Sequence, residues 1–321
     1  MQNYGVNLRD IEEAARRIAG IAHVTPVMTS SAIDHKAGRS LFFKCECFQK
    51  VGAFKFRGAT NAVLQLSEAE SRRGVLTHSS GNHAQALALA AKNRGITAHI
   101  VMPENSPLIK QRAVAGYGAK IYLCKPTLES REEEASRIQK ETGAVFIHPY
   151  DHPHIIAGQG TVALELLEQV KQLDAIVVPL GGGGQLSGIA LAVRELRPEA
   201  VVLGVEPSAA DDAARSRAAG VCLPPVPNPS TIADGLLTGL GELTWPVIRD
   251  LVSEVITVEE REIVAAMRLI WERMKVLVEP SAAVSLAGVL SETFMARTDV
   301  KRVGVVLSGG NLDLDKLPWD V

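Results

Sequence analysis

Aromatic residues, cysteine pairs and long apolar runs are scarce or missing in this chain of 321 residues. Phe, Trp and Tyr make up 4% of it, which argues against the base-stacking platforms of proteins that bind single-stranded nucleic acid. The net charge of −2 comes without a basic tract, so nucleic acid is not an expected partner. No apolar run reaches the length of a transmembrane helix, and we expect no membrane association.

The cysteines argue against two further classes of protein. Cys45, Cys47, Cys124 and Cys222 form no Cys-x-x-Cys pair, which disfavours a zinc knuckle or a redox motif. The N-terminus has neither the basic start nor the apolar core of a signal peptide. Free thiols and the expected lack of a signal peptide favour the reducing cytoplasm as the location.

One lysine stands in an unusual setting. Lys55 lies between Phe54 and Phe56, shortly after Gly52, at the expected start of a helix. Shielding by two rings would lower the pKa of the amine, and a neutral amine can attack a carbonyl group. The alternative is a surface lysine beside two core phenylalanines, which this short segment alone favours.

Short apolar segments alternate with helical patterns over most of the chain. Strands are expected at 40–48, 74–78, 98–102, 120–124, 144–148, 175–180, 201–206 and 302–307. Helices are expected at 8–22, 84–94, 109–117, 130–142, 160–169, 185–196, 263–275 and 281–291. This alternation predicts an α/β fold, with parallel-rich twisted sheets flanked by helices on both faces.

The same rhythm predicts two lobes with a cleft between them. The small domain is expected at 74–150, and the large domain at 1–73 and 151–321. Ligands of such sheets bind beyond the carboxyl ends of the strands. Three polar or glycine-rich turns, 79–83, 181–184 and 308–311, follow expected strands and would lie at such ends.

The run Gly181-Gly182-Gly183-Gly184 precedes an expected helix. Consecutive backbone N–H groups at a helix N-terminus bind phosphate, whereas a tight turn alone needs only one glycine. An NAD-binding oxidoreductase is one alternative, because Gly182, Gly184 and Glu206 partly match a dinucleotide fingerprint. That alternative does not account for Lys55 or for the turn at 79–83.

An imine-forming lysine, a phosphate site and polar turns together describe pyridoxal phosphate (PLP). The chain resembles the serine/threonine dehydratase family of PLP enzymes, which have the two-lobed fold type II. The matching segments are FQKxGxFKxRGA at 48–59, THSSGNH at 77–83, AGQGT at 157–161, GGGG at 181–184, EPSxADD at 206–212, TIADG at 231–235 and LSGGN at 307–311. They follow the family order over nearly the whole chain, and together they are highly specific.

The resemblance implies a role for each matching residue. Lys55 holds the cofactor as an imine and later acts as a base at Cα, while Ser308 bonds the pyridine nitrogen. The implied cofactor-binding residues are Phe54, Lys55, Asn82, Gly181, Gly182, Gly183, Gly184, Gln185 and Ser308. The implied substrate-binding residues are Ser79, Ser80, Asn82, His83, Arg131 and Thr238. A serine cannot keep the nitrogen protonated as a carboxylate would, which suits proton removal and β-elimination more than transamination.

Ser80 bears on the choice between two activities. Racemisation needs a base on each face of the planar carbanion, and Lys55 covers one face. Dehydratases of the family that do not racemise typically carry alanine where Ser80 stands. The resemblance therefore implies a catalytic pair, Lys55 and Ser80, that racemises serine and also eliminates its hydroxyl to give pyruvate and ammonia.

The family also implies further ligands. A divalent cation (Mg, Ca or Mn) is expected at Glu206, the Ala210 carbonyl and Asp212, whose hard oxygen ligands suit such ions. Without the family these three residues are more simply a solvated acidic turn. Activation by ATP is a further implication, at positions corresponding to a nucleotide site of animal relatives: Ser30, Ser31, Lys50, Gln85, Tyr117, Lys275 and Asn311. A homodimer is expected from the family as well.

Three alternatives stay open within or near the family. Threo-3-hydroxyaspartate dehydratase with aspartate racemase activity, or catabolic threonine dehydratase, would differ in pocket-wall residues such as Arg131, Tyr150 and Thr238. A regulator with a dead site is the third, against which intact Lys55 and Ser80 count. A transition-metal site at His148, Asp151, His152 and His154 is disfavoured, because Pro149 and Pro153 predict a mobile loop there.

Overall fold

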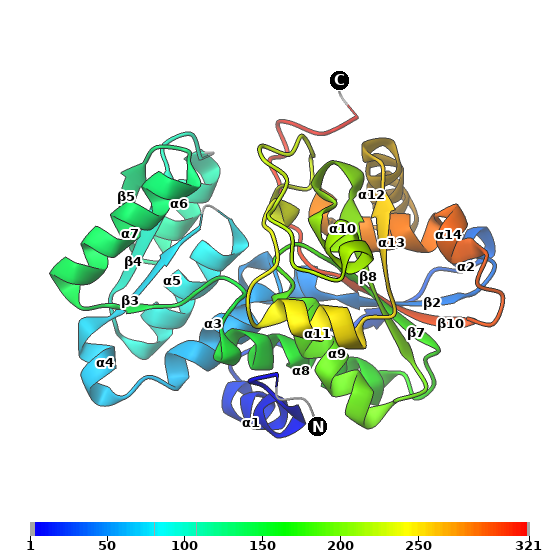
Figure 1. Cartoon of the computed structure of the whole chain (residues 1–321), viewed down its shortest axis with the longest axis horizontal. Coiled ribbons are helices and arrows are strands. Elements are labelled where there is room, and N and C mark those ends of the chain that lie inside the picture. The colour runs from blue at the N-terminus through cyan, green and yellow to red at the C-terminus, as the bar shows by residue number, and fades with distance from the viewer. Residues whose placement is uncertain (1–3, 80, 107, 320–321) are drawn as a thin grey trace.

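Two β-sheets lie side by side in the computed structural model, which describes residues 4–79, 81–106 and 108–319 (Figure 1). The six-stranded sheet with its helices is called the large lobe, and the four-stranded sheet with its helices the small lobe. Both sheets are built mainly from parallel strands. The predicted α/β class is therefore confirmed.

The sheet of the large lobe has the strand order β1-β2-β10-β7-β8-β9. Its strands are β1 (Val27–Met28), β2 (Ser40–Cys45), β7 (Ala175–Pro179), β8 (Val201–Pro207), β9 (Glu254–Val258) and β10 (Arg302–Leu307). Strand β1 pairs with β2 in the antiparallel direction, and the other neighbours are parallel. Strands β10 and β7, which are distant in sequence, are thus neighbours at the centre.

Helices cover both faces of this sheet. One face carries α1 (Leu8–Ile18), α8 (Pro153–Gln169), α9 (Gly184–Leu196), α10 (Asp212–Ala219) and α11 (Thr244–Leu251). The other carries α2 (Ser31–Ala37), α12 (Glu260–Met274), α13 (Pro280–Leu290) and α14 (Glu292–Met295). In β7, Ile176 and Val178 pack in the first layer and Val177 in the second, which explains why this strand is almost wholly apolar.

The small lobe is a parallel sheet with the order β5-β4-β3-β6. Its strands are β3 (Val75–His78), β4 (Ala98–Pro103), β5 (Lys120–Cys124) and β6 (Val145–Phe146). Helices α5 (Asn82–Arg94) and α6 (Leu108–Gly116) pack on one face, and α7 (Leu128–Thr142) packs on the other. Helix α4 (Glu68–Arg73) leads into β3.

Helix α3 (Lys55–Leu64) lies between the lobes (Figure 1). Its Phe56, Ala59 and Val63 belong to the small-lobe core, whereas its other side packs along α8 of the large lobe. This helix is therefore buried from two directions, and its first residue, Lys55, comes at the junction of the lobes.

The structure adds elements that were not expected from the sequence, among them strand β9 and helices α2, α10 and α11, and it corrects two expectations. Helix α8 begins at Pro153 rather than at 160, because proline is well suited to the first helical turn, and so His154 is helical instead of lying in a loop. Residues 46–48, expected as strand, form the 3-10 turn η1 (Glu46–Phe48). No helix among the described residues is long and apolar enough to span a membrane.

Candidate active site

Lys55 and Ser308 are brought together by a direct backbone link. After β2, the 3-10 turn η2 (Lys50–Gly52) places Val51 and Gly52 at positive φ, and the chain reverses into α3. Ala53 then forms a β-bridge with Gly309, and the Phe54 N–H donates to the Ser308 carbonyl at 3.0 Å. The end of β10 thus lies against the start of α3, and these are the two segments to which the family resemblance gives a role at the cofactor.

The Lys55 amine occupies a buried site that lowers its pKa. Its Nζ donates to the Pro149 carbonyl at 2.8 Å and lies 5.1 Å from the Phe54 ring centroid. Burial lowers the pKa of Lys55 to about 8, while the nearby Glu279 carboxylate opposes this shift. The expectation of shielding by two rings is half right, because Phe56 points into the small-lobe core instead.

A buried glutamate, missed at the sequence level, organises the next group. Glu279 is 3% exposed, and its carboxylate accepts from Asn82 Nδ2 at 2.8 Å and from the Asn311 N–H at 3.1 Å. Asn311 Nδ2 in turn donates to Asn82 Oδ1 at 2.8 Å and to the Val51 carbonyl at 2.7 Å. Burial raises the pKa of Glu279 to about 8. Its one sequence signal was a glutamate before Pro280, the first residue of α13.

The glycine loop, Gly181–Gly184, packs so closely against neighbouring groups that it leaves no room for side chains. Gly183 has φ of +85° and precedes α9, and a Cβ there would lie 2.6 Å from Ile248 Cδ1. A Cβ at Gly182 would overlap the Tyr150 ring. The loop is fixed by Thr244, whose hydroxyl donates to the Gly182 carbonyl at 2.9 Å. A glycine loop that leads into a helix N-terminus suits the phosphate of PLP, because its backbone N–H groups and the helix dipole favour a phosphate there.

The connection from β6 to α8 joins the lysine to the glycine loop. Pro149 accepts from Lys55, and the next residue, Tyr150, packs its ring against Gly182. Burial raises the pKa of Tyr150 to about 12, and Thr238 forms a side-chain hydrogen bond with it. Asp151 accepts from the N–H groups of residues 242, 243 and 244 at 3.0, 2.9 and 3.2 Å. Its carboxylate is therefore a helix cap, and the described ranges contain no group of three or more His, Cys, Asp or Glu side chains that could hold a metal ion.

The turn after β3 contributes polar groups from the small lobe. The Ser79 hydroxyl accepts from the Gly81 N–H at 3.4 Å. His83 is 2% exposed with Nε2 3.2 Å from the Ile147 carbonyl, and burial holds its pKa well below the usual range. Its Nδ1 is buried without a hydrogen-bond partner among the described residues. The predicted Ser80 lies outside the described residues.

Two predicted cofactor or substrate contacts are less central. Gln185 follows the glycine loop at the start of α9, and its buried Nε2 lacks a partner within the described structure. Arg131 lies in α7, where Nε donates to the Thr127 carbonyl at 3.3 Å and its charge helps to lower the pKa of His78, after the larger effect of burial. The structure therefore places Arg131 beside the end of β3.

The predicted metal ligands form a buried acidic site rather than a solvated turn. Glu206 is the penultimate residue of β8 and is 2% exposed, Ala210 ends the 3-10 turn η3 (Ser208–Ala210), and Asp212 begins α10 and is 4% exposed. Glu206 accepts from the N–H groups of Ala213 and Ala214 at 3.3 and 2.7 Å. Burial raises the pKa of Glu206 to about 8 and that of Asp212 to about 6. Two buried, mutually repelling carboxylates fit a divalent cation.

The residues predicted to form a nucleotide site fall into two groups, one near α5 and the other near α12. Turn η2, with Lys50, packs against α5, which carries the buried Gln85, and Asn311 bonds the same turn through Val51. Tyr117 packs against the small-lobe core. Ser30 and Ser31 begin α2, which packs on α12, and Lys275 caps the end of α12.

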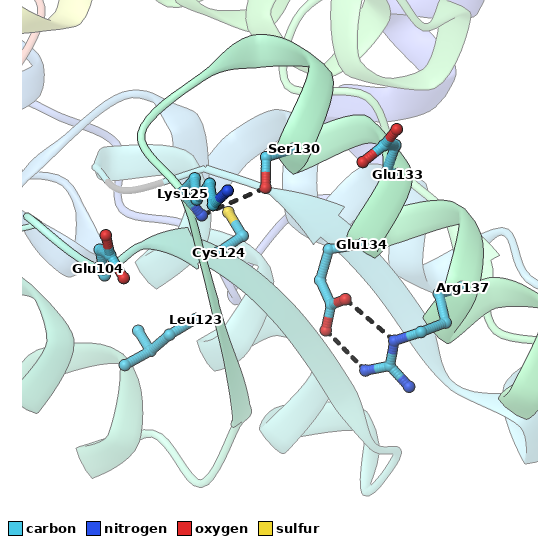
Figure 2. A pocket seen from close by; sticks show the side chains of 8 residues that line it. All are labelled: Glu104, Leu123, Cys124, Lys125, Ser130, Glu133, Glu134 and Arg137. Carbon is cyan, nitrogen blue, oxygen red and sulfur yellow. Dashed lines mark hydrogen bonds and ion pairs between the residues drawn. The ribbon is translucent and has the colours of Figure 1, made fainter.

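A separate open depression of about 480 Å³ lies on the small lobe between β5 and α7 (Figure 2). It is lined by Glu104, Leu123, Cys124, Lys125, Ser130, Glu133, Glu134 and Arg137. Figure 2 shows Arg137 paired with Glu134, at 2.6 Å, along the helix. None of the predicted site residues lines this depression.

Comparison with known proteins identifies the family of the chain. The model of the pyridoxal-phosphate dependent enzyme family matches residues 18–309. The chain is 53% identical to serine racemase of Arabidopsis thaliana over 322 residues, covering 99% of this chain and 97% of that protein. The solved structure of maize serine racemase is 52% identical with a TM-score of 0.96, covering 99% and 97% of the two chains. A pyridoxal 5'-phosphate-dependent aspartate racemase is 41% identical with a TM-score of 0.94, covering 99% and 100%.

The family match spans both lobes and includes Lys55, the glycine loop and Ser308. The chain therefore belongs to the family of pyridoxal-phosphate dependent enzymes.

Proposed function

We propose that this protein interconverts L- and D-serine and also eliminates water from serine to give pyruvate and ammonia. The observation that carries the proposal is the buried Lys55 amine, which donates to the Pro149 carbonyl in the connection to the glycine loop, at the start of a helix preceded by residues that bond the Ser308 and Gly309 backbone. The relatives that share about half of its sequence are named serine racemase.

The residues of the site have different proposed roles. When bound, PLP supplies an electron sink for the bond being broken at Cα. The glycine loop and the α9 N-terminus bind its phosphate, and Asn82 and Ser308 orient its ring. Lys55 takes the Cα proton on one face, because burial holds its amine closer to the neutral state than an exposed lysine. Ser79, Asn82 and His83 bind the substrate carboxylate, with Arg131 and Thr238 on the pocket wall.

Ser80 is the proposed base on the second face. We predict that Ser80→Ala abolishes racemisation yet retains L-serine dehydration, because elimination needs proton removal from one face only. D-serine and pyruvate are measured together, and Ser79→Ala is the matched control, expected to weaken substrate binding without separating the two products. Undiminished racemisation by Ser80→Ala would exclude Ser80 as the second base.

The function is tested by following both products from L-serine with the yellow holoenzyme and magnesium. D-serine and pyruvate together support the proposal, whereas pyruvate alone makes the protein a dehydratase. Neither product, with the colour intact, would move the substrate to aspartate, hydroxyaspartate or threonine. Aspartate is the second candidate, because a similar solved structure is an aspartate racemase.

We further propose a divalent cation at Glu206, Ala210 and Asp212, and ATP as an activator at the nucleotide candidates. The first is supported by two buried carboxylates with raised pKa, and the second by the contact of η2 with α5. A cytoplasmic homodimer with domains at 74–150 and at 1–73 plus 151–321 completes the proposal. The free thiols of Cys45, Cys47, Cys124 and Cys222 agree with a reducing compartment.

A further inference from the structure

Arg57 stands two residues after Lys55, on the opposite side of the first turn of α3. It is 1% exposed and is among the largest fully buried side chains. Its guanidinium donates to both oxygens of Glu46, at 2.7 and 2.8 Å, and to both oxygens of Glu165, at 2.6 and 2.8 Å. Two bidentate pairs fix a planar guanidinium in position and in orientation.

Lys44 completes this cluster, which we call the Arg57 ion cluster (Lys44, Glu46, Arg57 and Glu165). The Lys44 Nζ donates to Glu165 Oε2 at 2.6 Å and to the Thr25 carbonyl at 2.7 Å. The cluster thus contains two cations, Lys44 from β2 and Arg57 from α3, and two carboxylates, Glu46 from η1 and Glu165 from α8. A buried cluster of this kind contributes little net stability compared with an apolar core, so its value lies in the geometry that it specifies.

Glycines bring α3, α8 and α9 into close contact. A Cβ on Gly158 of α8 would lie 2.6 Å from the Gly58 Cα of α3. A Cβ on Gly188 of α9 would lie 2.6 Å from the Gly160 nitrogen of α8. Backbone thus meets backbone at both crossings, and α8 connects the helix that begins with Lys55 to the helix that begins at the glycine loop.

We propose that Arg57 is a positioning residue that sets the separation between the Lys55 amine and the glycine loop. Its pairing with Glu165 fixes α3 on α8, and the crossing at Gly160 and Gly188 fixes α8 on α9. A cofactor bonded to the lysine at one end and bound through its phosphate at the other requires this separation to be held closely. The inference rests on the PLP cofactor of the family and not on the identity of the substrate.

The test compares PLP with pyridoxal, which lacks the phosphate. PLP engages both Lys55 and the glycine loop, whereas pyridoxal engages Lys55 alone. The ratio of their dissociation constants for the apoenzyme therefore measures how well the two sites can be occupied together. Binding is followed by cofactor absorbance, and inorganic phosphate binding to the apoenzyme reports on the glycine loop alone.

Arg57→Met is expected to reduce the preference for PLP over pyridoxal by about tenfold or more, and Arg57→Lys by less, because lysine keeps the charge without the bidentate geometry. Inorganic phosphate should bind these variants as it binds the wild type. Ile270→Ala is the matched control, since Ile270 is fully buried in α12 on the opposite face of the large sheet. It should lose stability while keeping the wild-type preference.

If Arg57→Met does not fold, Glu165→Gln answers the same question, because it keeps the shape and removes one charge of the cluster. Gly158→Ala, which forces α3 and α8 apart, should give the same loss of preference. Folded variants with the wild-type preference would overturn the proposal, as would a wild type that binds pyridoxal as tightly as PLP. Both results come from cofactor binding and not from turnover of serine. A failure of the positioning proposal can therefore be distinguished from a failure of the proposed racemase function.

Discussion

At the scale of single residues, Glu279 is a buried acid next to the candidate cofactor site whose pKa is strongly raised by burial. Its pKa rises from an ordinary value of 4.5 to about 8, so the folded protein keeps a proton that the unfolded chain has lost. The contribution of Glu279 to the free energy of unfolding should therefore fall as pH rises from 4.5 to 8, and it should change no further above pH 8. Asn82 and Asn311 both donate to this carboxylate, so its charge bears directly on Asn82, which is proposed to orient the ring.

Glu279→Gln is expected to flatten this pH dependence in the apoenzyme. Between pH 5 and pH 8, the free energy of unfolding of the wild type should fall by on the order of 3 kcal/mol more than that of Glu279→Gln. Each tenfold change in proton affinity corresponds to about 1.4 kcal/mol. Chemical unfolding at a series of pH values measures it, and the exposed Glu199→Gln is the control. Parallel pH curves for Glu279→Gln and wild type would contradict the prediction.

Glu206 allows a second prediction at this scale. Magnesium or calcium should raise the melting temperature of the wild type, because a cation that binds only the folded protein stabilises it by about 2.7 kcal/mol at a hundredfold excess over its Kd. Glu206→Gln should lose most of this gain, whereas the exposed Asp315→Asn should retain it. Equal cation-dependent shifts in all three proteins would place the ion elsewhere.

At the scale of elements, Asp151 shows how one side chain joins two segments. It caps the N-terminal turn that leads into α11, while Tyr150 beside it packs on the glycine loop. We predict that Asp151→Ala lowers the free energy of unfolding by roughly 1–3 kcal/mol and weakens PLP binding, because three N–H groups lose their acceptor. Asp151→Asn keeps one acceptor oxygen and should be intermediate. If the free energy of unfolding of Asp151→Ala lay within about 0.5 kcal/mol of wild type, as for ordinary surface changes, the capping role would be excluded.

The elements near the site were predictable to different degrees. Strand β7 and the glycine loop carry local signals, an apolar run followed by glycines, and both were expected at their observed places. Strand β9 was missed, because an edge strand with Glu254 and Thr257 among its five residues lacks the apolar run of a buried strand. The start of α8 was placed late because Pro153 was interpreted as a helix breaker, although proline is well tolerated at the first helical position.

At the scale of the whole molecule, the sequence predicted which motifs would meet but not how they are supported. Lys55 and Ser308 were expected in one site because the family resemblance gives both a role at the cofactor, and the structure joins their segments through Ala53 and Gly309. The pairing of Arg57 with Glu165 spans 108 residues and has no local pattern, so only the folded chain shows it. Glu279 was missed for the same reason, since its partners Asn82 and Asn311 were not linked to it by any local pattern.

The two lobes are also joined by an ion pair between Lys110 of α6 and Asp234, which begins the 3-10 turn η4 (Asp234–Leu236). The Asp234 side chain is 50% exposed, so the pair should contribute less than about 1 kcal/mol to stability. We predict that Lys110→Met and Asp234→Asn leave the melting temperature nearly unchanged but speed amide hydrogen exchange in α6, because local opening of this helix no longer has to break the contact with the large lobe.

Exchange followed by mass spectrometry on residues 108–116 measures this effect, and the pair Arg268–Glu272 within α12 supplies the control. Arg268→Met should leave exchange in α6 unchanged, because that pair does not cross between lobes. The double variant at 110 and 234 should exchange no faster than either single variant, since both remove one interaction. Additive acceleration in the double variant would mean that the two side chains act separately, and the contact would then have no role in holding the small lobe against the large one.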